Sequence, residues 1–243
     1  MAVKINPLEQ FKIEPIIPIH IGNLDVSFTN SSLFMIVAAV LITALVVLST
    51  RGARLVPGRW QSATELFYEF VSTMVDENAG HEGRPYFPFI FTLFMFILFG
   101  NLLGLVPYAF TFTSHIIVTF ALAAVVFIGV TIIGIVRHGF RFLTLFVPHG
   151  VPLPLLIILV PIEVLSYFIR PFTLSLRLFA NMMAGHTMLA IFAGFVVSLG
   201  IFGILPLGIN VALIFLELLV AALQAYVFAI LTTLYLHDAI HLH

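Results

Sequence analysis

The sequence predicts an all-α polytopic membrane protein, and three observations lead to this fold class. Of the 243 residues, 61% are hydrophobic and only 9% are charged, whereas a soluble domain has about 25% charged residues. Long apolar stretches recur along the chain, and several can cross a hydrocarbon core of about 30 Å. Six of the eight arginines lie in the connections between these stretches, which is typical of membrane proteins.

Five spans are expected within one membrane domain that covers residues 1–243. Three of them have ordinary length and cover residues 33–48, 86–106 and 116–136. The other two, 151–197 and 208–236, would measure about 70 Å and about 40 Å as continuous helices, so both should be tilted or bent. Pro161 and Pro171 are the expected bend points, and a Gly/Pro-rich turn at 200–208 separates the two helices.

Residues 60–77, between the first two spans, have the pattern of an amphipathic helix. Its apolar face consists of Trp60, Ala63, Phe67, Phe70, Val71 and Met74, and its polar face of Gln61, Glu65, Ser72 and Asp76. A helix with this pattern is expected to lie in the membrane interface. A soluble insertion is the alternative, but no other apolar segment lies beside it in the sequence.

The short loops predict the orientation, because positively charged loops stay inside. The positive loops contain Arg51, Arg54, Arg59, Arg84, Arg137 and Arg141. The connection 107–114 carries no charge. With five spans, the amino-terminal segment 1–31 is therefore expected outside and the carboxyl terminus inside.

Several ionisable residues lie well inside the last two apolar helices, namely Glu163, Arg170, Arg177, His186 and Glu217. A charged residue at the centre of a membrane helix costs about 2.5 to 3.5 kcal/mol on insertion scales. A chain that keeps several such residues usually uses them on an ion path. The sequence therefore predicts a conducting function.

The spacing of these residues places them on defined helix faces, at about 100° per residue. One stripe of the fourth span combines Glu163, Ser166, Arg170, Thr173, Arg177, Asn181 and Gly185. One face of the fifth span combines Glu217, Ala221, Gln224 and Tyr235. Two half-polar helices of this kind could pair and leave a hydrated track. His186 lies about half a turn from Arg177, so an entry channel separate from the stripe is one interpretation.

Structural alternatives exist for two pairs. Glu163 and Arg170 could form a buried ion pair at i,i+7, and His186 with Glu217 could form a structural hydrogen bond. Arg177 is different, because it does not deprotonate and has no carboxylate within one turn of its own helix. Its counter-charge must come from elsewhere, for example from another subunit.

Weaker signals add little chemistry. The Gly100–Gly104 spacing favours close helix packing, with Asn101 bonding between helices. His237 and His241 have the i,i+4 spacing of metal ligands, although a fraying polar terminus is favoured, so no metal site and no cofactor are expected. The net charge of −1 makes nucleic-acid binding improbable, and the absence of cysteine excludes disulfides and thiolate metal sites.

The chain resembles a known family over nearly its whole length, and one motif is the most specific part of this resemblance. The segment 174–186, LSLRLFANMMAGH, is similar to the arginine-bearing helix of the subunit a family of F-type ATP synthases. Segments 100–107 and 217–238 and the opening 6–11 support the resemblance. Gly104 departs from the pattern, because some bacterial members carry an acid there.

The resemblance implies roles for individual residues. Arg177 matches the essential arginine that faces the ring of c subunits and its proton-carrying carboxylate, and Asn181 and Gln224 match its polar neighbours. His186 and Glu217 match the pair of the outer half-channel, in the mitochondrial arrangement with histidine first. The inner, exit half-channel is matched by Glu163, Ser166 and Thr173.

The resemblance also implies a place in a larger machine. Protons would enter near His186 and Glu217, ride the c-ring and leave near Glu163, with Arg177 separating the two offset half-channels. The subunit would itself make no ATP, and its partners would be the c-ring, the peripheral-stalk b subunits, the remaining ATP synthase and the lipid bilayer. A bacterial inner membrane is expected, with the mitochondrial inner membrane as the alternative. The sequence leaves open whether the transported ion is a proton or sodium. The alternative class of protein is a self-contained secondary transporter.

Overall fold

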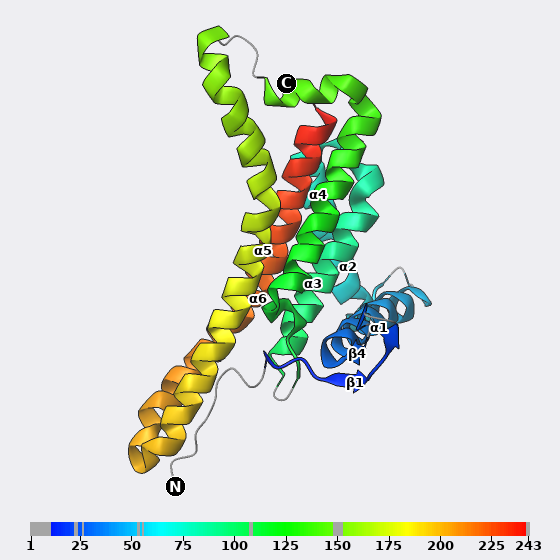
Figure 1. Cartoon of the computed structure of the whole chain (residues 1–243). Helices are drawn as coiled ribbons and strands as arrows, with labels where there is room; N and C mark the ends of the chain where they lie inside the picture. Colours follow the sequence, from blue (N-terminus) through cyan, green and yellow to red (C-terminus); the bar gives the residue numbers. More distant parts are fainter. Residues whose placement is uncertain are drawn as a thin grey trace. The chain divides into compact units, whose positions relative to one another are not determined.

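The computed structural model describes residues 11–21, 24–25, 27–52, 54, 56–106, 109–147 and 153–241. Figure 1 shows a chain built mainly from helices. The α-helices are α1 (Asn30–Thr50), α2 (Arg59–Ala79), α3 (Phe87–Gly104), α4 (Ile116–His138), α5 (Leu153–Ser198) and α6 (Ile204–Ile240). The 3₁₀ segments are η2 (His81–Tyr86), η3 (Phe112–Ser114), η4 (Gly139–Phe146) and η5 (Gly200–Gly203).

The predicted fold class is confirmed. Five helical stretches are long and apolar enough to cross a membrane, and they cover Asn30–Thr50, His81–Gly104, Ile116–Phe146, Leu155–Ser198 and Gly200–Ile240. The amphipathic segment forms α2 and is not among them. The opening 6–11 lies outside the described residues except for Phe11.

Contacts divide the chain into two compact units. The first comprises the described residues of Met1–Thr64, Met95–Ile116 and Leu178–Ala225. The second comprises those of Glu65–Phe94, Ile117–Arg177 and Tyr226–His243. The helices α2, α3, α5 and α6 contribute residues to both units, and α4 contributes its first residue, Ile116, to the first unit.

In the first unit, two short pairs of antiparallel strands precede α1. The apolar sequence pattern did not predict these strands. β1 (Pro15–Ile17) pairs with β4 (Phe28–Thr29), and β2 (His20–Ile21) pairs with β3 (Leu24–Asp25). Asn30 fixes this segment to the start of α1. Its side-chain oxygen accepts from the backbone N–H of Glu14, and its side-chain nitrogen donates to the Lys12 carbonyl. Its backbone N–H donates to the Glu14 carbonyl at 3.1 Å.

The Gly100–Gly104 motif in this unit packs against a loop. A side chain at Gly100 would collide with the Phe112 ring, and one at Gly104 would collide with Thr111. Asn101 does bond to another helix, because its amide nitrogen donates to the Ala221 carbonyl of α6 at 3.2 Å. The close approach predicted from the glycines thus serves the connection after α3, while Asn101 makes the predicted bond between helices.

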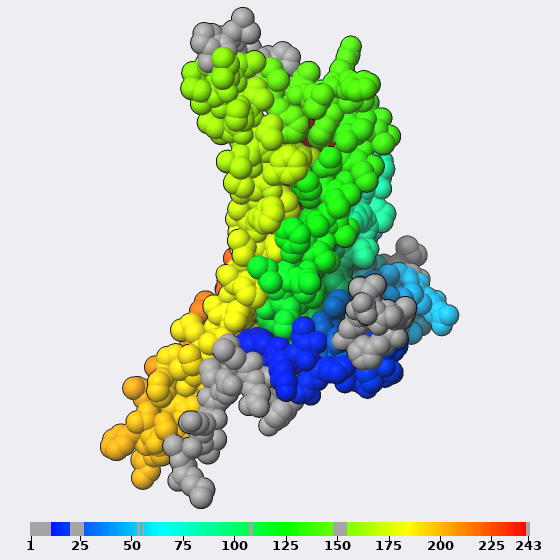
Figure 2. Space-filling view, in the orientation of Figure 1, coloured from blue at the N-terminus to red at the C-terminus, as the bar shows by residue number. Residues whose placement is uncertain are grey.

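The turn between α5 and α6 is shorter than the predicted 200–208. Gly200, with φ 55°, takes the left-handed conformation that favours glycine, and α6 already begins at Ile204. Pro206 lies in the first turn of α6, where its missing N–H removes no helical hydrogen bond. Figure 2 shows the last part of α5 and the first part of α6 lying against each other, and many of their large apolar side chains are exposed.

In the second unit, α2 packs antiparallel to the first half of α3. Phe67 meets Phe94 with ring centroids 6.3 Å apart, and Tyr68 meets Phe91 at the same separation. Trp60 and Phe70, which belong to the predicted apolar face, are 76% and 44% exposed. Val71, Met74, Val75 and Ala79 are the buried apolar residues of α2, and Thr64 is buried as well, so the buried stripe reaches the end of the helix.

The helix α5 runs unbroken through Pro161 and Pro171. Each proline lacks an N–H, so the carbonyls of Ile157 and Tyr167 lose their helical donors. In the second unit, side-chain bonds fix this helix to α4. Thr119 and Ser175 are bonded at 3.1 Å, and Thr131 and Tyr167 at 2.6 Å.

Candidate functional site

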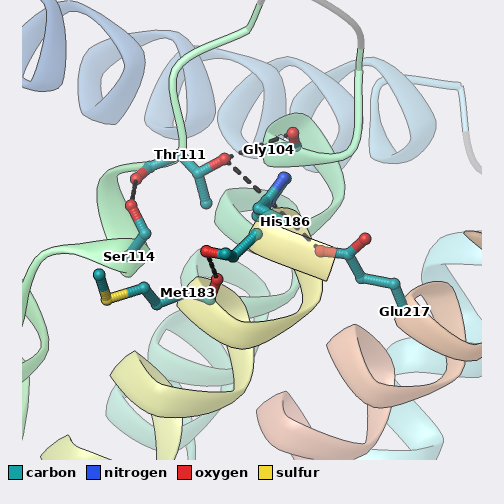
Figure 3. Close-up of polar contacts among 7 residues, drawn as sticks. Gly104, Thr111, Ser114, Met183, His186 and Glu217 are labelled. Carbon is teal, nitrogen blue, oxygen red and sulfur yellow. Dashed lines mark hydrogen bonds and ion pairs between the residues drawn. The ribbon is translucent and has the colours of Figure 1, made fainter. Parts of the chain in front are cut away.

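A buried histidine and a buried glutamate meet in the first unit. His186 of α5 and Glu217 of α6 have Nε2 and Oε1 3.5 Å apart, and their side chains are 10% and 4% exposed. Figure 3 shows the two side chains directed toward one another. Within the described part of the chain, neither carboxylate oxygen of Glu217 has a hydrogen-bond partner. A buried carboxylate held only by an ionisable neighbour is suited to gain and lose a proton.

Gly185 makes room for this carboxylate. A Cβ built at Gly185 would lie 2.7 Å from Glu217 Oε1 and 2.9 Å from Cδ. Such contacts are far closer than carbon atoms tolerate, so any side chain there would displace the carboxylate. Gly185, predicted as one member of a polar stripe, is therefore a steric requirement of the pair.

Thr111 adds a third side chain to the pair, and sequence reasoning missed it. Its Oγ1 lies 3.1 Å from His186 Nε2 and donates to the Gly104 carbonyl at 3.3 Å. Ser114 Oγ donates to the Thr111 carbonyl at 2.6 Å (Figure 3). The sequence pattern of the connection 107–114 indicates only a lack of charge, although its hydroxyl residues, Thr111, Thr113 and Ser114, are a usable signal.

A cavity of about 870 Å³ borders His186 in the first unit. Its lining includes Thr111, His186 and Asn210. Lys12, from the segment before α1, and Asn30, the first residue of α1, also line it. The Phe11 ring stands edge-on to His186, with ring centroids 6.2 Å apart and planes at 84°. The cavity can therefore bring a small polar species such as water or a proton carrier to His186.

Asn181 and Gln224 form a second polar contact between α5 and α6. Asn181 Nδ2 donates to Gln224 Oε1 at 3.0 Å. Gln224 is 1% exposed, and its amide nitrogen finds no acceptor among the residues that the structure describes. Three residues of the predicted polar face of the fifth span, Glu217, Ala221 and Gln224, are all buried.

Arg177 belongs to the second unit and occupies an exposed position on α5. Across residues 11–147 and 153–241, as far as they are described, it makes no hydrogen bond and no ion pair. An arginine keeps its charge under all ordinary conditions. Its exposed guanidinium thus has no anionic partner among the described residues.

Arg170 pairs with Asp238 of α6, so the alternative of a Glu163–Arg170 ion pair is wrong. Arg170 Nη1 lies 3.1 Å from Asp238 Oδ2 in the second unit. Its guanidinium also lies 4.9 Å from the Tyr235 ring centre and 5.5 Å from that of Tyr167. Asp238 was missed because it stands beyond the apolar run, where a fraying terminus was expected.

No hydrogen bond or ion pair joins the three residues predicted for the inner half-channel, all of which the structure describes. Glu163 is half-buried, whereas Ser166 and Thr173 are exposed on α5. The Thr173 hydroxyl donates to the Arg170 carbonyl of the preceding turn at 2.9 Å. These side chains line one stripe of the helix, as the spacing predicted, without forming a cluster.

The terminal histidines lie beside each other at the end of the described residues. The rings of His237 and His241 lie 4.6 Å apart. No group of three or more histidine, aspartate or glutamate side chains capable of holding a metal occurs in residues 11–241 as far as they are described.

The fold and this site define a polytopic membrane protein with ionisable side chains buried between its last two helices. Comparison with known proteins identifies the family. The family model for the ATP synthase A chain matches residues 32–237. ATP synthase subunit a of Paramagnetospirillum magneticum is 57% identical over 245 residues, covering 98% of this chain and 99% of the relative. The chain belongs to the ATP synthase A chain family.

Other relatives agree. ATP synthase subunit a of Parvibaculum lavamentivorans is 59% identical over 244 residues, covering 98% of this chain and 94% of the relative. That of Rhodospirillum rubrum is 54% identical over 239 residues, covering 98% and 99%. Membership makes this chain a membrane subunit of the proton-translocating Fo sector of an ATP synthase complex. Its bacterial relatives indicate a bacterial membrane.

Proposed function

We propose that this chain is the stator subunit that supplies two offset proton half-channels to a ring of c subunits. The observation that carries the proposal is the buried His186–Glu217 pair, in which Nε2 and Oε1 lie 3.5 Å apart. His186 also lines a cavity of about 870 Å³. Protons enter through this cavity from outside, and His186 and Glu217 pass them on. Histidine suits this task because its ordinary pKa lies near neutral pH. Asn181 and Gln224 form the polar wall next along the two helices.

Arg177 separates the two half-channels. Its permanent positive charge favours deprotonation of an approaching c-ring carboxylate and repels a proton that would pass directly between the half-channels. The proposal is supported by its exposed position and by its lack of an ion pair among the described residues. The counter-charge then comes from the c-ring.

The exit half-channel follows the stripe of Glu163, Ser166 and Thr173. Glu163 precedes Arg177 by 14 residues, about 21 Å along a helix, which reaches the opposite half of the membrane. The proton that leaves there has crossed the membrane potential, and each crossing of 100 mV releases about 2.3 kcal/mol. Several protons must therefore pass for each ATP. Because the ATP is made elsewhere in the complex, this subunit is itself non-catalytic.

The remaining parts of the proposal concern placement. The membrane is the bacterial inner membrane, with the carboxyl terminus in the cytoplasm, and the peripheral-stalk b subunits hold the chain against the rotating ring. The helix α2 lies near the cytoplasmic interface, which is supported by its exposed acidic residues and the arginines beside it.

Cysteine labelling tests the separation of the half-channels, and the native chain has no cysteine to give background. An impermeant thiol reagent should label Asn210→Cys, which lines the cavity, only from outside. It should label Ser166→Cys only from the cytoplasm, because a thiolate forms only where water is present. Leu165→Cys is the matched control, since Leu165 is 61% exposed but apolar and faces lipid in this proposal.

Two results would contradict the rotary function. Labelling of Asn210→Cys and Ser166→Cys from one side would mean a continuous pore. Purification of the active chain without a small proteolipid ring would favour the rival class, a self-contained secondary transporter.

A further inference from the structure

We propose that Thr111 is a positioning residue of the proton path, whose hydroxyl holds the His186 ring beside Glu217 in both protonation states of Nε2. The inference rests on the proposed function of the His186–Glu217 pair. Thr111 is 4% exposed, and its Oγ1 lies 3.1 Å from His186 Nε2 and 3.3 Å from the Gly104 carbonyl oxygen. Figure 3 shows the hydroxyl between these two partners.

The hydroxyl group fits both states of the ring because it has one hydrogen and two lone pairs. When Nε2 carries a hydrogen, Oγ1 accepts it and donates its own hydrogen to the Gly104 carbonyl. When Nε2 is bare, the hydroxyl turns and donates to Nε2. The ring nitrogen thus keeps a hydrogen-bond partner throughout, so a buried polar atom is never left unpaired by the transfer.

The transfer itself takes place between His186 and Glu217. The one hydrogen on Nε2 is shared between two acceptors, the Thr111 hydroxyl oxygen at 3.1 Å and Glu217 Oε1 at 3.5 Å. The Nε2–H bond of the imidazolium breaks and an O–H bond forms on Glu217 Oε1. Both groups become neutral in this step, and the Thr111 hydroxyl turns to Nε2. After Glu217 passes its proton on, a proton arriving through the cavity restores the Nε2–H bond. Thr111 gains and loses no proton in the cycle.

Thr111 is itself fixed from two sides. Its carbonyl accepts the Ser114 hydroxyl at 2.6 Å. On the other side, its side chain lies so close to α3 that a Cβ at Gly104 would be 2.6 Å from Oγ1. This close approach allows the hydroxyl to reach both the Gly104 carbonyl and His186.

The test uses the complete ATP synthase in inverted vesicles and measures ATP-driven proton pumping. Thr111→Val removes the hydroxyl and keeps the branched shape, and pumping should fall about tenfold, which corresponds to about 1.4 kcal/mol. Thr111→Ser restores a hydroxyl and should recover at least half of the lost pumping. Co-purification with the rest of the complex confirms that each variant is assembled.

Thr113→Val is the matched control. Thr113 lies in η3, is 0% exposed, and its hydroxyl has no hydrogen-bond partner within the described residues. This variant loses the same group from the same buried turn and should pump like the native complex. Equal losses in Thr113→Val and Thr111→Val would assign the effect to packing and overturn the inference.

Two further outcomes separate this inference from the function on which it rests. Native pumping by Thr111→Val, or no recovery in Thr111→Ser, would remove Thr111 from the path while an inactive His186→Ala keeps the proposed function. Native pumping by His186→Ala would instead remove the pair itself, and with it both proposals.

Discussion

Gly185→Ala is the sharpest steric test of the His186–Glu217 pair. The added Cβ would lie 2.7 Å from Glu217 Oε1, and ordinary contact begins at 3.4 Å, so the carboxylate must move by 3.4 − 2.7 = 0.7 Å. Overpacking of this kind costs about 1–3 kcal/mol. Replacement of a helical glycine by alanine returns about 0.4–1 kcal/mol. The net loss of stability should therefore be small enough for the complex to assemble.

The effect on transport should be larger than the effect on stability. A misplacement of about 1 Å at a reacting group can reduce a rate about a hundredfold. We expect ATP-driven proton pumping by Gly185→Ala to fall between about tenfold and a hundredfold in inverted vesicles, with the complex recovered intact.

Gly208→Ala provides the matched control for this prediction. Gly208 lies in α6, and a Cβ built there meets no atom within 4 Å. This variant also gains helix propensity and should pump normally. If Gly185→Ala pumped as well as Gly208→Ala, the carboxylate position would not matter, and the role of Glu217 in proton transfer would have to be abandoned.

Two further predictions concern charge. Arg177→Lys keeps a positive charge but introduces an ammonium that can lose its proton when desolvated, so pumping should collapse in an assembled complex. Native pumping by this variant would remove Arg177 from the mechanism. Exchange of the outer pair, His186→Glu with Glu217→His, should preserve more pumping than either single replacement, because a buried lone charge costs about 3–5 kcal/mol whereas the exchanged pair keeps its partner. A double variant no better than the worse single one would show that the two residues are not coupled.

The helical fold class could be predicted from the sequence because apolar runs of membrane length have few alternative structures. The residues on one face of α6 were likewise predictable, since Glu217, Ala221 and Gln224 follow helical periodicity. Periodicity within one helix does not identify partners on another. The structural alternative for Arg170 therefore named Glu163 on its own helix, whereas its partner is Asp238 on α6.

Loop residues were harder to predict for a related reason. Thr111 approaches His186 only because the chain turns back after α3 over two glycines, which no helical spacing encodes. The short strands before α1 were also missed. They are held largely by backbone hydrogen bonds and by Asn30, with exposed apolar side chains such as Ile16 and Ile17, so hydrophobic patterning contains little information about them.

The carboxylate of Glu217, which accepts no hydrogen bond in the described structure, is useful for transport but unfavourable for stability. A buried acid without hydrogen-bond donors in the described structure is a burden on the folded chain, and an apolar or amide replacement that fills the same space would relieve it. Selection for thermal stability alone would therefore be expected to remove Glu217 early. In a library sorted first for heat resistance and then for proton transport, this position should be among those where the two selections favour different residues.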